Sequence, residues 1–165
     1  VVLDGKAEPA TPAEAFAFAD LCAQPFQKRY AAAARLFDRA LTADPQLAAD
    51  LGPTRYNAAC YAVLAAGGEG IDAPTDAVAR TALRQMALGW LRADLALRRK
   101  QAASADAAER RTAAANLSHW LEDTDLSGVR DPGPLAALPD AERSEWEALW
   151  ADVKATLADA LKPPE

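Results

Sequence analysis

The chain has 165 residues, about a quarter of which are alanine, and it carries a formal net charge of −6 at pH 7. Because alanine favours helix and β-branched residues are sparse, with Ile71 the only isoleucine, the composition predicts an all-α fold. The acidic balance disfavours nucleic acid as a partner, because a phosphate backbone requires a basic surface.

The apolar segments and the cysteines indicate where the protein acts. Charged residues or glycine interrupt every apolar segment before it reaches about 18 residues, so we expect no membrane insertion and no signal peptide. Cys22 and Cys60 lie in apolar helical stretches without further ligands at metal spacing, which predicts reduced core residues, no metal and no cofactor. We therefore expect a cytoplasmic protein. Since the chain begins with Val1 and a stretch of linker composition, we also expect it to be a piece of a longer protein.

Proline, glycine and capping residues divide the chain into six expected helices. Pro45 and Gly52-Pro53 separate helices, and Thr11 and Ser104 are expected N-caps. The expected helices are 12–23, 28–43, 53–66, 75–101, 105–121 and 140–161, with single turns at 46–51 and 135–138. These helices predict a linker at residues 1–11, one helical domain at 12–161 and a disordered tail at 162–165.

Apolar residues at spacings of three and four predict the buried face of each helix. The expected core positions are Phe18, Leu21 and Cys22; Leu83, Met86, Trp90 and Ala93; Leu117, Trp120 and Leu121; and Trp146, Leu149, Trp150, Val153 and Leu157. Charged side chains near helix ends are expected to complement the helix dipole, and the glutamates among them are expected on an exposed helix face. They are Arg98, Arg99 and Lys100 at one helix end and Glu142, Glu145 and Glu147 at one helix start.

A repeated pattern links the first four helices. The stretch KRYAAAARLFDRALTADP, residues 28–45, places small and aromatic residues on one helical stripe and ends in proline. Phe18, Leu21 and Cys22 recur as Tyr56, Ala59 and Cys60 about 38 residues later. This pattern resembles the tetratricopeptide (TPR) repeat. The resemblance implies a TPR-like stack of antiparallel helix pairs, an α-α superhelix of about six helices; an irregular α-bundle is the alternative.

Several longer stretches resemble something more particular. They are RYNAACYAVLAAGG (55–68), ALGWLRADL (87–95), HWLEDTDLSGVRDP (119–132) and LPDAERSEWEALWADV (138–153). Together they resemble the C-terminal helical-repeat regions that follow the kinase domain in many bacterial serine/threonine protein kinases. The kinase motifs themselves are absent, with no Gly-rich phosphate loop, no His-Arg-Asp loop and no Asp-Phe-Gly site. We therefore expect this fragment not to be an enzyme.

No group of side chains predicts catalysis. His119 is the only histidine, and it follows Ser118 on a helix, where the two side chains point to different faces. The segment Asp123-Thr124-Asp125 lacks the glycine and distal glutamate of a calcium loop. Arg130 and Asp131 are expected to hold the long loop around them by hydrogen bonds rather than to bind a ligand. We predict no catalytic, cofactor or metal residues.

The TPR resemblance implies a concave groove lined by the first helix of each pair, where such folds bind extended peptides. The residues that would face it are Phe16, Asp20, Thr54, Asn57 and Tyr61, with Ala23 beside them. Lysine and arginine are absent from these positions, so we expect an apolar or mixed peptide rather than a carboxylate-ended one. A protein partner is expected, the parent's own kinase domain among the candidates. The alternative is a structural spacer or self-association module whose groove is filled by its own 123–139 segment.

Overall fold

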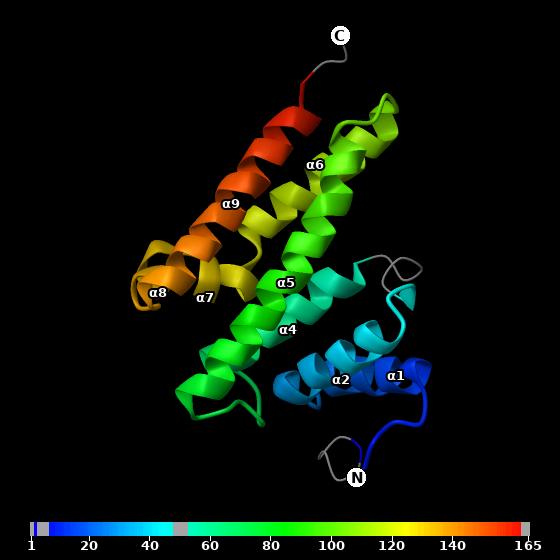
Figure 1. The fold of residues 1–165 in the computed structure, drawn as a ribbon, viewed down its shortest axis with the longest axis vertical. Coiled ribbons are helices and arrows are strands. Elements are labelled where there is room, and N and C mark those ends of the chain that lie inside the picture. The colour runs from blue at the N-terminus through cyan, green and yellow to red at the C-terminus, as the bar shows by residue number, and fades with distance from the viewer. Residues whose placement is uncertain (1, 3–6, 48–52, 163–165) are drawn as a thin grey trace. The chain divides into compact units, whose positions relative to one another are not determined.

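The computed structural model describes residues 2, 7–47 and 53–162, and every regular element in these ranges is helical (Figure 1). The helices are α1 (Pro12–Ala23), α2 (Tyr30–Ala43), α4 (Thr54–Gly67), α5 (Ala77–Ala102), α6 (Ala107–Glu122), α7 (Ser127–Arg130), α8 (Pro132–Ala136) and α9 (Asp140–Ala160), with a short 3-10 helix η1 (Thr124–Leu126). The all-α prediction is confirmed, and the six expected helices form within two residues of their predicted ends. The turn expected at 46–51 lies mostly outside the described residues. TPR-type stacking stays a prediction.

The chain divides into two compact units, Val1–Trp90 and Leu91–Glu165. In the first unit α1 and α2 form a helical hairpin, and α2 also packs against α4. In the second unit α6 packs against α9, and the short helices between them lie close to the start of α9.

Local hydrogen bonds explain where several helices begin. The Thr11 hydroxyl accepts from the Glu14 amide at 3.1 Å, with Pro12 in the first helical position, as predicted. In front of α6 the cap is not Ser104 as expected but Asp106, whose carboxylate accepts from the Ala108 amide at 2.8 Å. The Ser104 hydroxyl accepts from the Asp106 amide at 3.1 Å and so holds the capping residue itself.

The start of α2 is capped by a residue far along the chain. Its own N-cap position, Arg29, makes no side-chain capping bond. Instead the carboxylate of Asp72, in the loop between α4 and α5, accepts from the amides of Ala31 at 3.2 Å and Ala32 at 2.8 Å. The amide of Ile71 adds a bond to the Lys28 carbonyl at 2.9 Å. This loop therefore closes over the first turn of α2 and satisfies its free amides.

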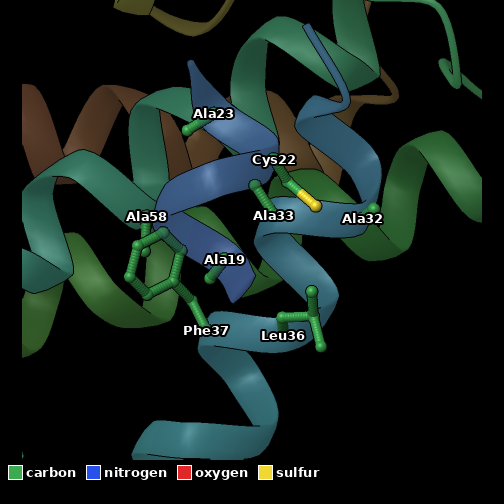
Figure 2. Packing of buried hydrophobic residues seen from close by; sticks show 8 residues of the cluster. All are labelled: Ala19, Cys22, Ala23, Ala32, Ala33, Leu36, Phe37 and Ala58. Carbon is green, nitrogen blue, oxygen red and sulfur yellow. The ribbon is translucent and has the colours of Figure 1, made fainter. Parts of the chain in front are cut away.

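Small side chains let α1 and α2 approach closely in the first unit. Its core cluster is drawn in Figure 2 and consists of Ala19, Cys22, Ala23, Ala32, Ala33, Leu36, Phe37 and Ala58. The buried stripe of α1 is made by alanines and Cys22, whereas Leu21, expected in the core, is 38 % exposed. Phe18 is half-buried and packs against the cluster. The apolar pattern misplaced Leu21 because the close contact with α2 selects small side chains over large ones.

Large side chains fill the second unit. Trp120 and Trp146 are almost completely buried, as expected, and the indole of Trp150 donates to the Val129 carbonyl at 2.7 Å. Leu149 and Val153 are also buried, so the predicted stripe of α9 is confirmed at these positions. Leu117 is buried as expected, whereas Leu121 and Leu157 are half-buried.

Two ion pairs define the direction of α9 relative to residues 91–102 of α5. Arg92 lies 4.0 Å from Glu145, and Arg99 lies 2.7 Å from Asp152. From the first pair to the second, the residue number rises by seven on both helices, from Arg92 to Arg99 and from Glu145 to Asp152. Within the second unit these two helical segments therefore run parallel.

Burial along α5 differs from the expectation. Leu83 is buried as predicted, but Met86 and Trp90 are half-buried and Ala93 is exposed. The helix instead buries a charged pair: Arg98, predicted to complement the dipole at the helix end, is 7 % exposed and lies 3.4 Å from the carboxylate of Asp94 one turn earlier. Glu142 on α9, expected on a solvated face, is likewise 5 % exposed. Glu142 was assigned to the surface by residue type, and the spacing of four between Asp94 and Arg98 did not by itself indicate that the pair is buried.

Candidate functional site

Aromatic side chains from three helices form a continuous row in the first unit. The ring of Phe16 on α1 meets Phe37 on α2 edge to face, with centroids 5.2 Å apart. Phe37 stacks on Tyr61 of α4 at 6.1 Å, and Tyr61 stacks on Tyr30 of α2 at 5.9 Å, almost parallel. We call Phe16, Phe37, Tyr61 and Tyr30 the aromatic row. Phe37 is buried, whereas the other three are half-exposed and offer ring surface.

Of the five predicted groove residues, two belong to the aromatic row, two are exposed one helical turn away from it, and one is buried. Phe16 and Tyr61 are members, joined through Phe37. Asp20 is exposed one helical turn beyond Phe16, and Asn57 is exposed one turn before Tyr61. Thr54 also lies on α4 but is only 4 % exposed, so its hydroxyl has little surface for a ligand.

The loop between α4 and α5 packs against Tyr30, one member of the aromatic row. Gly70 adopts a positive φ of 92°, and a β-carbon there would lie 2.6 Å from the Lys28 carbonyl and 3.0 Å from the ring of Tyr30. Only glycine therefore allows the loop to pack on Tyr30 while Asp72 caps α2. The sequence marked residues 67–70 as a loop but did not show this support, because the contact joins residues about 40 positions apart.

The chemical character of this surface is mixed. The rings of the row offer apolar area, Asn57 offers an amide that donates and accepts, and Asp20 offers a carboxylate. The side chains named here include no nucleophile paired with a base. The arrangement suits binding through stacking and hydrogen bonds.

A surface cavity of about 530 Å³ lies in the second unit, within the size range of small-molecule sites. It is lined by Arg99, Ala102 and Ala103 together with Ala155, Thr156 and Asp159. Its charged groups are already paired, Arg99 with Asp152 at 2.7 Å and Asp159 with Lys162 at 2.6 Å. The Thr156 hydroxyl donates to the backbone carbonyl of Asp152. The cavity therefore presents paired charges and alanine methyl groups.

The segment after α6 is held by internal bonds, as expected for Arg130. Its guanidinium donates to the carbonyls of Trp120 at 3.1 Å and Asp123 at 2.6 Å. His119 is exposed and its Nε2 lies 3.3 Å from the carboxylate of Asp123, which also caps η1 by accepting from the Asp125 amide. These contacts give His119 and Asp123 a structural role.

The environment of Asp125 shifts the pKa of its carboxyl group. Burial raises the pKa of Asp125 above the ordinary value of 3.8, the neighbouring charge of Asp123 raises this pKa further, and His119 lowers it. The carboxyl belongs to the short 3-10 helix η1, on the segment that Arg130 holds. A raised pKa at this place marks a cost of burying the charge and is no sign of acid-base chemistry by itself.

Comparison with known proteins leaves the family open, because no family model, no curated protein and no solved structure matches this chain. Among residues 2, 7–47 and 53–162, no helix combines the length and the apolar character that spanning a bilayer requires. The class that the residues themselves define is an all-α chain with a half-exposed aromatic row on its first unit.

Proposed function

We propose that this chain is a non-catalytic, TPR-like interaction domain that binds an apolar or mixed peptide over the aromatic row. The observation that carries the proposal is the pair of stacked rings, Tyr61 on Tyr30, both half-exposed, with the exposed amide of Asn57 one helical turn before Tyr61. Aromatic anchors with a polar rim are typical of protein interfaces.

Two further features support a repeat architecture. The α1–α2 hairpin is built from alanines that allow close approach, with Phe37 filling the gap toward α4. In the second unit α9 runs parallel to residues 91–102 of α5, as equivalent helices of successive repeats do. Neither feature depends on a resemblance in sequence.

The wider setting belongs to the same proposal. On the resemblance of its longer stretches, we place the domain in a bacterial serine/threonine kinase or a related signalling protein, acting in the cytoplasm. Its partner is then another protein or the parent's own kinase domain. Nucleic acid is disfavoured by the net charge of −6.

The test begins with a random-peptide phage selection on the whole chain, followed by fluorescence anisotropy with the enriched peptides. The binding variant is Asp20→Lys with Asn57→Lys, because both side chains are exposed and their change leaves the stacked rings in place. The matched control is Glu147→Lys with Ala151→Lys, which makes the same change in charge at exposed positions on α9. We expect enriched peptides rich in apolar residues whose affinity falls by about fivefold or more in the binding variant only.

Other outcomes of this test separate the alternatives. Peptides that bind both variants as well as they bind the unmodified chain would place the interaction on another surface. A selection without enrichment would favour the spacer or self-association module, and the self-filled groove would then be the explanation to examine. Tyr61→Ala is unsuitable here, because loss of its ring would disturb both Phe37 and Tyr30.

A further inference from the structure

Residues near the N-terminus contact α2 through two arginines on one stripe of that helix. The guanidinium of Arg35 donates to the Val2 carbonyl at 3.4 Å, and that of Arg39 donates to the Pro9 carbonyl at 3.2 Å. Arg39 also forms an ion pair with the carboxylate of Glu8. Because Arg35 and Arg39 are four residues apart, they lie one above the other along the helix. We call their shared surface the arginine face.

Apolar contacts accompany these polar ones. Pro9 is buried, although it lies only three residues before the start of α1. Val2 is half-buried and packs against the core cluster of the first unit. Residues 7–10 form no helix, so their backbone carbonyls are free to accept from side chains. The contacts are those of a bound peptide: main-chain bonds for affinity and a few side chains for selectivity.

We infer that the arginine face of α2 is a peptide-binding site for a non-helical segment that carries a Glu-Pro pair, and that Val2, Glu8 and Pro9 occupy it as an intramolecular ligand. Arg39 contacts both members of the pair: it pairs with the Glu8 carboxylate through its charge and donates to the Pro9 backbone carbonyl, while the buried ring of Pro9 favours proline. Arg35 donates to the Val2 backbone carbonyl. Because any residue has such a carbonyl, this contact adds affinity but no selectivity for the side chain.

Charge favours an acidic ligand here. The guanidinium groups of Arg35 and Arg39 give this stripe of α2 a local positive charge, although the chain as a whole has a net charge of −6. The Arg39–Glu8 pair is exposed on both sides, 46 % and 59 %, so water and salt weaken it. Selectivity for glutamate over lysine is therefore expected to be modest, and the buried Pro9 and the two carbonyl bonds provide the rest of the interaction.

The short connection between Pro9 and α1 determines when a second peptide can bind to the arginine face. Pro9 is joined to α1 by two intervening residues, which holds the segment at an effective concentration of about millimolar or more. A free peptide of the same chemistry must compete with that concentration. The site is therefore open to a partner only when the contacts of the internal Glu-Pro pair are weakened, which makes Glu8 and Pro9 an intramolecular competitor.

The experiment measures anisotropy of a fluorescein-labelled peptide with the sequence of residues 1–10. Its target is the full chain carrying Glu8→Ala and Pro9→Ala, the opened variant. We expect saturable binding to the opened variant and binding about fivefold weaker or more to the unmodified chain. We also expect the affinity to fall as salt is raised. Adding Asp20→Lys and Asn57→Lys should leave this binding unchanged, because those residues are exposed one helical turn away from the aromatic row instead.

A charge exchange tests the role of Arg39 directly. The opened variant with Arg39→Glu should prefer a peptide in which Glu8 is replaced by lysine, reversing the preference by about threefold or more. If that variant loses helicity by circular dichroism, Arg39→Gln takes its place and should bind the two peptides equally. Absence of saturable binding to the folded opened variant up to about 2 mM peptide would overturn the inference. An unchanged preference for glutamate after the Arg39 substitution would do the same.

Discussion

Replacing Ala33 by leucine tests the close contact between α1 and α2. Ala33 is completely buried in the core cluster, beside Ala19 and Cys22 (Figure 2). Leucine adds three carbon atoms in a contact made of small side chains, which forces neighbouring side chains or the helix axes to move. Overpacking of this kind costs about 1 to 3 kcal/mol of the free energy of unfolding. For a chain of this length that corresponds to a melting temperature lower by about 2 to 12 °C.

Differential scanning calorimetry on the full chain measures this effect, with circular dichroism to show that helicity is retained. Ala17→Leu is the matched control, since it makes the same change at an exposed position of α1 and should alter stability by less than about 0.5 kcal/mol. An Ala33→Leu melting temperature equal to that of the control would refute the packing argument. It would mean that the hairpin contact has room for a large side chain.

Three further predictions concern Asp72, Gly70 and Asp125, and Gly89 in the middle of α5 serves as the comparison for Gly70. Asp72→Ala removes the cap of α2 and should lower the free energy of unfolding by about 0.5 to 2 kcal/mol in urea titrations; an unchanged midpoint would show that water caps the helix equally well. Gly70→Ala should cost more than about 1 kcal/mol, because its φ is positive and its new β-carbon would clash with backbone. Gly89→Ala, in the middle of α5 with open space around it, should instead stabilise by about 0.5 to 1 kcal/mol, and equal effects of the two glycine changes would contradict this reasoning. Since burial raises the pKa of Asp125 in the folded chain, the folded state binds protons more tightly, and stability falls as pH rises from 3.8 through the raised pKa. Asp125→Asn should therefore stabilise the chain at pH 7, with a gain that shrinks as pH falls toward 3.8; a gain independent of pH would show that charge burial is not the cause.

Helix positions followed from local sequence signals, whereas burial within each helix often did not. Thr11 before Pro12 defines the start of α1 by chemistry that the chain itself contains within a few residues. Leu21 was misplaced because hydrophobicity alone ranks leucine above alanine as a core residue. The contact between two helices depends on volume, which a periodic pattern does not report.

The burial of charged residues was also not predictable from the sequence. Glu142 was assigned to solvent and Arg98 to a dipole interaction at the helix end, and burial was predicted for neither, since isolated charges are rarely buried. Arg98 is buried because Asp94, one turn earlier, pairs with it. A spacing of four between opposite charges was visible in the sequence, but it is equally typical of exposed helix surfaces and so could not indicate burial.

The candidate site was predictable in part. Phe16 and Tyr61 were named from their helical positions, and both belong to the aromatic row. Thr54 was assigned to the same groove as an implication of the TPR resemblance, yet it is buried. The contribution of Gly70 had no local signal, because the atoms that it meets belong to residues about 40 positions earlier.

The cap on α2 also has a consequence for the order in which the protein assembles during synthesis. The amide of Ala32 and the carboxylate that caps it are separated by 40 residues. At about 5 to 20 residues per second, a ribosome needs about 2 to 8 seconds to add that stretch after α2 has begun to emerge. During this interval the first turn of α2 must rely on water, and α1 and α2 can pair before that turn is fixed. The hairpin therefore reaches its final form only after α4 and the loop behind it have been made.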